Sequence, residues 1–166
     1  VIADHPDMYL NTGHVSGPEA LRLVELAQDF GIEKVLVAHP ARRRLTLDQK
    51  KEIVGRGVFL EAVFAECVYP GGIPRTHYYV EPEYMHNIPS DPSKRYTLRD
   101  MGEEIQEIGP EHFILATDYG VRAAAPPMES VRQFIASLLD MEFSPETIRT
   151  MTSENPATLL GIDGAS

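Results

Sequence analysis

The chain has 166 residues, of which 43% are hydrophobic and 24% are charged, as is typical of a folded domain with one core. Its 15 Lys and Arg residues against 25 Asp and Glu residues give a formal net charge of -10, which argues against nucleic acid or an anionic membrane as a partner. The single cysteine, Cys67, excludes an intrachain disulfide, and no apolar run approaches the ~20 residues of a membrane span. These features predict a cytoplasmic protein.

Strand-like and helix-like segments alternate along the chain. Near-continuous or alternating apolar residues predict strands at 8–12, 34–38, 58–63 and 113–117. Helical spacing and helix-start signals predict helices at 16–30, from 46 onward, at 98–108 and at 131–139, with two short final helices opening at 144 and 155. Alternating strands and helices form right-handed parallel units, and four units make half of an eight-stranded barrel. We therefore predict an α/β fold with parallel β/α units, in a single domain over 1–166.

A long segment at 65–96 interrupts this alternation. It is dense in Pro, Gly, Tyr and His and has no sustained periodicity. Loops of this length inside a domain are often lids or binding loops, so Arg75 and His77 are candidates for contact with a substrate, with Arg75 suited to an anionic group. A solvated loop without a binding role is the simpler alternative.

Polar residues stand at the carboxyl ends of the predicted strands. His14 follows the first strand, His39 follows the second, Asp118 follows the last, and Glu61 lies within the third. Because the carboxyl ends of parallel strands face the active site of a barrel, the two imidazoles and the Asp118 carboxylate should converge. Zinc accepts these ligand types, keeps a position open for water and lowers its pKa. We therefore predict a divalent metal, zinc by preference, held by His14, His39 and Asp118, with Asp118 also the general base.

Each of these residues also has a structural interpretation. A single histidine at a strand end is commonly a hydrogen-bonded structural residue, but three polar residues at equivalent positions of three strands favour a shared function. Glu61 stays open between two roles: it lines the site and contacts a substrate, or it forms a structural ion pair with an arginine.

Five segments carry a resemblance to a known family: 12–16 (TGHVS), 35–40 (VLVAHP), 57–61 (GVFLE), 115–120 (LATDYG) and 154–161 (ENPATLLG). Together they resemble the carboxyl-terminal half of the metal-dependent hydrolases of the amidohydrolase superfamily, closest to an uncharacterised, amidohydrolase-like branch. The resemblance implies a (β/α)8 TIM barrel, of which this chain has strands five to eight. It also implies that His14 is the fifth-strand ligand, His39 the sixth-strand ligand, and Asp118 the eighth-strand residue that takes the proton from the nucleophilic water. The segment 154–161 is expected to be structural and to cap the last helix.

The metal-ligand set that the resemblance implies has a gap. In that superfamily the ligands also include a His-x-His pair on the first strand and a Lys or carboxylate on the fourth. No His-x-His pair occurs in this chain, and no residue of it stands for the fourth-strand ligand. A half-barrel also leaves two open sheet edges and an apolar inner face. Because these surfaces need a cover, we expect either self-association or a missing N-terminal half-barrel. The opening residues, which resemble the tail of a helix, agree with the second possibility.

The implied reaction is hydrolysis of a C–N or C–O bond in a small polar substrate by a metal-activated water. One alternative is a truncated, non-catalytic barrel fragment or interaction module. Another is a phosphoesterase that uses a similar His/Asp metal site. The residues leave the substrate and the number of metal ions open.

Overall fold

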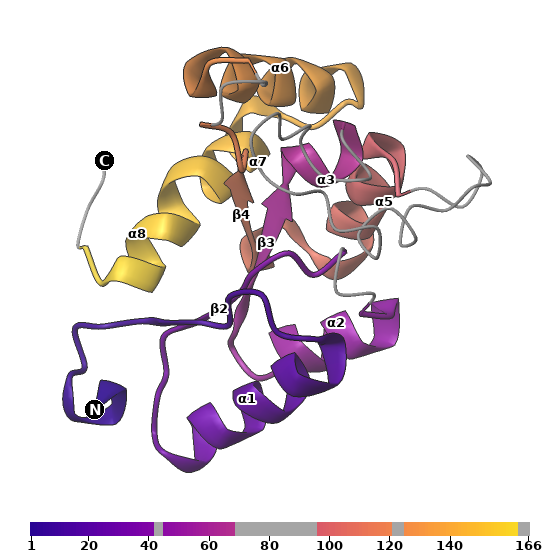
Figure 1. Cartoon of the computed structure of the whole chain (residues 1–166). Coiled ribbons are helices and arrows are strands. Elements are labelled where there is room, and N and C mark those ends of the chain that lie inside the picture. The colour runs from indigo at the N-terminus through magenta and orange to yellow at the C-terminus, as the bar shows by residue number, and fades with distance from the viewer. Residues whose placement is uncertain (42–44, 69–95, 121–124, 163–166) are drawn as a thin grey trace, which may run out of the picture.

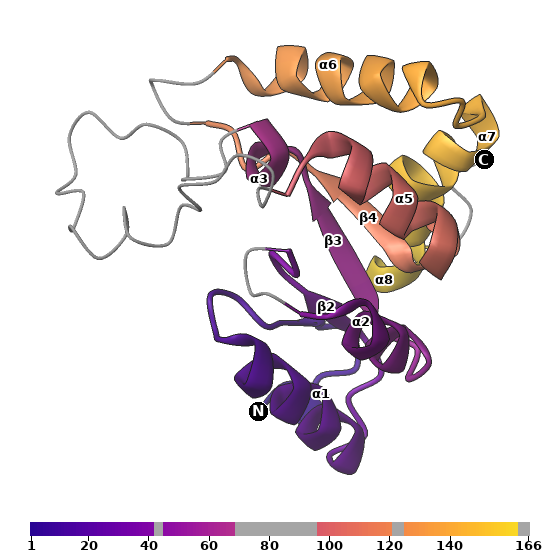
Figure 2. The same cartoon turned by 90° about the vertical axis from the view of Figure 1, so that its right-hand side faces the viewer.

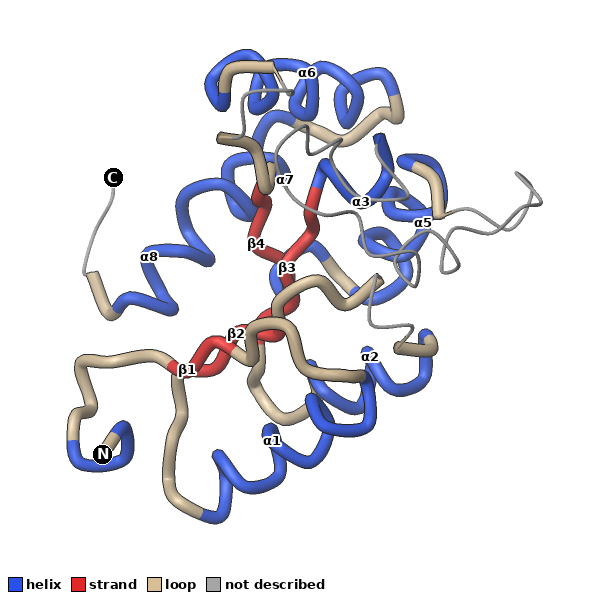
Figure 3. The backbone as a smooth tube through the Cα atoms, in the orientation of Figure 1, coloured by secondary structure: helices blue, strands red, loops and turns tan. Residues whose placement is uncertain are grey.

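A computed structural model of the chain describes residues 1–41, 45–68, 96–120 and 125–162. Within them, four parallel strands form one sheet in the order β1–β2–β3–β4, as Figure 3 shows. The strands are β1 (Leu10–Asn11), β2 (Val35–Val37), β3 (Phe59–Val63) and β4 (Phe113–Ala116). Each lies inside its predicted range, so the α/β fold with parallel units is confirmed.

Helices follow the strands in chain order. The α-helices are α1 (Gly17–Asp29), α2 (Leu47–Val54), α3 (Phe64–Val68), α5 (Leu98–Ile108), α6 (Pro127–Asp140), α7 (Pro145–Arg149) and α8 (Asn155–Leu160), with 3-10 turns at Ile2–Asp4 and Pro110–His112. Figure 1 shows α1 and α2 at the β1–β2 end of the molecule and α5 to α8 at the β4 end. Figures 1 and 2 both place α6 beyond the carboxyl end of β3, next to α3. In the described part of the chain no helix is long and apolar enough to cross a membrane.

Local capping explains where two of these helices begin. At α2, the Thr46 hydroxyl accepts a hydrogen bond from the Gln49 backbone N–H at 3.2 Å, and the Gln49 side chain accepts one from the Thr46 N–H at 2.9 Å. Thr97 and Asp100 form the same reciprocal pair at α5. Such a capping box satisfies two of the backbone N–H groups that a helix start leaves without partners.

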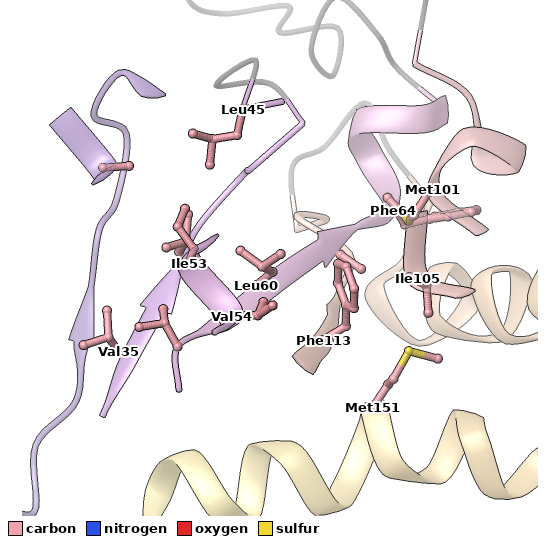
Figure 4. Close-up of a cluster of buried hydrophobic side chains, with 14 of the residues drawn as sticks. Val35, Leu45, Ile53, Val54, Leu60, Phe64, Met101, Ile105, Phe113 and Met151 are labelled. Atoms are coloured by element: carbon pink, nitrogen blue, oxygen red, sulfur yellow. The ribbon is translucent and has the colours of Figure 1, made fainter. Parts of the chain in front are cut away.

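The two faces of the sheet are covered unequally. Alternate strand residues such as Val35, Leu60 and Phe113 face the helices and join the main core, where they pack with helix residues that include Ile105 and Met151 (Figure 4). In β2 to β4 the intervening residues form the opposite face, which we call the inner face: Leu36, Phe59, Glu61, Val63, Ile114 and Ala116. On the inner face Leu36 and Val63 are buried, whereas the other four are half-buried.

The last two helices differ from the expectation of two separate elements. A π-helical turn at Thr150–Glu154 joins α7 to α8, so the helical backbone is continuous from 145 to 160. The segment 154–161 caps the last helix as expected, because Gly161 ends it in a left-handed conformation with a φ of 69°. Asn155 does not cap the start of α8. Its side-chain amide instead donates to the carbonyls of Pro110 at 2.9 Å and Phe113 at 2.6 Å. A cap would need the side-chain oxygen as an acceptor, whereas here the amide hydrogens tie the helix to the start of β4.

The predicted loop at 65–96 begins later than its composition suggested. Residues 65–68 belong to α3, which follows β3 directly, and α3 buries Phe64, Ala65 and Glu66. The apolar run that predicts β3 therefore continues into a short helix. Residues 69–95, which include the candidates Arg75 and His77, lie outside the described residues.

Candidate functional site

Three of the four strands end in the same backbone conformation. The residue two positions beyond β1, β2 and β4 is left-handed: Gly13 has a φ of 61°, His39 of 51° and Asp118 of 55°. Glycine adopts this conformation freely, whereas for other residues it costs about 1–2 kcal/mol of conformational free energy. His14 therefore stands one position beyond the place equivalent to His39 and Asp118, which corrects the expected equivalence. The reason is the tight turn after β1, in which the Asn11 side chain accepts a hydrogen bond from the Gly13 N–H at 2.7 Å.

The structure brings His14 and His39 side by side. Their ring centroids lie 4.8 Å apart with an interplanar angle of 42°. The His39 side chain is buried, whereas His14 is exposed. The buried Thr12 links the two strand ends, because its N–H donates to the Leu36 carbonyl at 3.0 Å and its hydroxyl accepts from the Ala38 N–H at 3.0 Å. This pairing holds the two histidines at one edge of the sheet.

Two carboxylates from the β3–α3 segment hold His39. Glu66, in the first turn of α3, places its Oε1 atom 3.2 Å from Nδ1 of the His39 ring. Glu61, on β3, accepts a hydrogen bond from the His39 backbone N–H at 3.4 Å. Both side chains of the His39–Glu66 pair are buried, at 8% and 4% exposure, so little water competes for their contact. Sequence reasoning missed Glu66 because its helix reads as the start of the long loop.

Burial and charge both act on Glu61. Burial raises the pKa of the Glu61 carboxyl above its ordinary value, while His39 lowers it through its charge and its backbone N–H. The charges of Glu66 and Asp118 add smaller upward contributions. Among the described residues, Glu61 contacts His39, and no described arginine forms an ion pair with it.

Asp118 lies at the same edge of the sheet on the β4 side. Its side chain is exposed, and the preceding residue, Thr117, joins β4 to α3 because its carbonyl accepts from the Ala65 N–H at 3.2 Å. The strand ends thus gather imidazoles from β1 and β2 with carboxylates from β3, α3 and β4.

The side chains at the strand ends have the right ligand types for zinc, but they are not arranged as a zinc site. Imidazole nitrogen and carboxylate oxygen are ordinary zinc ligands. Among the residues that the structure describes, however, no group of three or more His, Cys, Asp or Glu side chains is placed to hold a metal ion. The ligand types are therefore present at one edge, but they do not form an assembled three-ligand site.

Comparisons with known proteins bear on the fold. A family model described as "Family of unknown function (DUF6282)" matches residues 1–61, which include β1, β2 and most of β3. A search of curated proteins finds no match to the sequence. Among solved structures, the chain is similar to a Pseudomonas putida protein named provisionally as a 2-pyrone-4,6-dicarboxylic acid hydrolase, with a TM-score of 0.61 and 16% sequence identity.

That similarity covers 98% of this chain and 55% of the Pseudomonas putida protein, so the chain spans just over half of that protein's length. At 16% identity the likeness shows the fold alone. The four-stranded parallel sheet with its helices is consistent with a fragment of a TIM-barrel-like fold. The parallel α/β fold is therefore supported, whereas membership of the amidohydrolase superfamily stays a prediction.

Proposed function

We propose that this chain is the carboxyl-terminal half of the barrel of a metal-dependent hydrolase of the amidohydrolase type, with β1 to β4 as its strands five to eight. The reaction would be the hydrolysis of a C–N or C–O bond in a small polar substrate. The observation that carries the proposal is the pair of imidazoles of His14 and His39, 4.8 Å apart at the strand ends, with carboxylates of neighbouring elements around them. The named activity of the Pseudomonas putida protein agrees with a hydrolase.

Each residue then has a role set by its position. His14 and His39 would bind the metal with Asp118, and a bound divalent ion such as zinc lowers the pKa of a water molecule toward neutrality. Asp118 is exposed at the end of β4 and is the residue suited to accept a proton from that water as general base. Glu61 belongs to the half-buried inner face, where its carboxyl can meet a polar substrate group.

A further part of the proposal concerns what covers the inner face. Among the described residues no further strand pairs with the outer edges of β1 and β4, and the inner face has half-buried apolar residues such as Phe59 and Ile114. Soluble proteins cover such surfaces. We propose that another half-barrel covers them, supplied by a further segment or by a second copy.

Zinc titration of the chain tests the metal site. Calorimetry should show one Zn²⁺ bound per chain, with affinity at least about 10-fold lower in His14→Ala and His39→Ala, because each change removes a ligand. His112→Ala is the matched control, since His112 lies at the opposite, amino-terminal end of β4. A panel of lactones, esters, amides and phosphoesters then separates carboxyl-group hydrolysis from phosphoesterase chemistry. Absence of zinc binding, with unchanged stability in chelator, would contradict the proposal.

One observation favours a second candidate, a non-catalytic barrel module. The described side chains do not form a three-ligand group, although their types are suitable. A module of this kind would fold without metal and would bind no zinc, so the same titration distinguishes the two candidates.

A further inference from the structure

The two carboxylates on His39 contact different parts of the residue. Glu66 meets the ring at Nδ1, whereas Glu61 meets the backbone N–H. A neutral imidazole carries one hydrogen, on Nδ1 or on Nε2, and an ionised carboxylate can only accept hydrogen bonds. A contact of 3.2 Å between Glu66 Oε1 and Nδ1 therefore favours the form in which Nδ1 carries the hydrogen.

We infer that Glu66 is a positioning residue that fixes His39 in its Nδ1–H tautomer and leaves the Nε2 lone pair available to a ligand. The inference goes beyond the proposed function, because the tautomer follows from a contact within the chain. Only the use of Nε2 as a metal ligand rests on the proposed function.

The surroundings of Glu66 suit this role. Glu66 is 6% exposed and stands on α3, which begins at the residue after β3. Phe64 at the start of α3 is buried and its ring stacks on that of Phe134 in α6, with centroids 5.0 Å apart. A carboxylate on a short, packed helix keeps one orientation, and it therefore orients the ring that it contacts.

The ring of His39 also has a fixed backbone. Its φ of 51° is left-handed, and Glu61 accepts the N–H of that residue. Glu61 thus contributes to the backbone geometry without contacting a ring nitrogen. Because Glu61 contacts the His39 backbone and Glu66 contacts its ring, Glu61→Gln is a matched control. Glutamine keeps a side-chain oxygen that can accept the same backbone N–H.

The tautomer can be read directly by NMR. The test uses the metal-free chain with ¹⁵N-labelled histidine rings, at a pH where the His39 ring is neutral, and a correlation spectrum through the ring carbon-bound hydrogens. The His39 signals are identified by their absence in His39→Gln. In the wild-type chain we expect Nδ1 to be protonated and Nε2 to be unprotonated.

Three variants separate the effects of Glu66 and Glu61 on the tautomer of the His39 ring. Glu66→Ala should lose the predominance of the Nδ1–H form and shift toward the Nε2–H form that free imidazole prefers. Glu66→Gln should retain Nδ1–H, because its amide oxygen can still accept, and Glu61→Gln should retain it as well. An Nε2–H ring in the wild-type chain would overturn the inference even if Glu66→Ala failed to fold, and so would an unchanged ring in a folded Glu66→Ala.

A metal titration of the same proteins distinguishes this inference from the proposed function. If both hold, Glu66→Ala should weaken Zn²⁺ binding by about 10–100-fold, as the loss of a partner that orients a ligand does. If the wild-type chain shows the Nδ1–H form but binds no zinc, the positioning role of Glu66 is supported and the proposed function fails.

Discussion

His39 and Asp118 share a left-handed backbone conformation, and each stands two residues beyond the end of its strand. Aspartate and histidine tolerate this conformation better than most residues do, although glycine alone adopts it freely. Backbone strain of this kind is concentrated at functional sites. Among the described strands, β2 and β4 carry this conformation on a non-glycine residue just beyond their carboxyl ends, and the other such residue, Glu142, follows helix α6.

Asp118→Gly should be more stable than Asp118→Ala by about 1 kcal/mol, because alanine keeps the strained Cβ and glycine does not. Both variants lack the carboxylate, so the difference between their free energies of unfolding reports the strain of the backbone conformation alone. Denaturant unfolding of the two proteins measures it. Equal stabilities, or a more stable alanine variant, would show that the conformation carries no strain.

Lys50 and Glu104 form a buried ion pair whose loss should be costly. The Lys50 side chain is 2% exposed, and its Nζ atom lies 2.7 and 2.6 Å from the two carboxylate oxygens of Glu104. Lys50→Ala leaves that carboxylate without its cation and should cost about 3 kcal/mol, the lower end of the usual range because Glu104 is partly exposed.

Lys51→Ala is the matched control for this experiment, since the adjacent pair of Lys51 and Glu107 is exposed on both sides. It should cost between about 0 and 1 kcal/mol in the same urea titration. Similar losses for the two variants would argue against a special role of burial at Lys50.

Glu61 should make stability depend on pH. Burial raises the pKa of its carboxyl in the folded chain, so the folded state binds a proton more tightly than the unfolded state. Its contribution is therefore present below the unfolded pKa and is lost as pH rises through the folded pKa. Glu61→Gln, which resembles the protonated form, should be more stable than the wild type at neutral pH and should lose that advantage in acid. Thermal unfolding across pH 4 to 7 (roughly the carboxyl range) measures the difference, and a constant offset would contradict it.

Asn155 should matter for the attachment of the final helix to the sheet. Its buried side-chain amide donates to the backbone carbonyl of Pro110, in the 3-10 turn before β4, and to that of Phe113, the first residue of β4. Asn155→Ala removes the donor from both acceptors and should cost about 2 kcal/mol. Thr158→Ala, on the exposed side of α8, should change stability by less than ~0.5 kcal/mol in the same measurement.

The inner face should make the isolated chain associate. Its half-buried apolar residues, and the outer edges of β1 and β4, with which no strand of the described ranges pairs, favour contact with another polypeptide. Native mass measured by light scattering should exceed that of one chain, or rise with concentration. A monodisperse single chain over a wide concentration range would contradict this expectation.

Local patterns were sufficient for the four strands and for most of the helices, though not for α3. The apolar run at 35–37 predicts a buried strand because parallel strands are covered on both sides, and Thr46 with Gln49 predicts the start of α2 because capping involves neighbours in sequence. Residues at strand ends were also identifiable, since parallel order places His14, His39 and Asp118 at one edge. The role of Glu66 was not, because the apolar residues before it obscure where β3 ends and α3 begins.

The sequence by itself determined the order of the β/α units and the polar residues at their ends, since both depend on short-range periodicity and on residue type. Only the tertiary structure decided that Gly13, rather than His14, matches His39 and Asp118 in backbone conformation. Only the tertiary structure showed that Glu66 contacts the His39 ring and that the Asn155 amide binds backbone carbonyls at and just before the start of β4. These contacts join residues from different elements, so they depend on how helices and strands pack and leave no signal in local spacing.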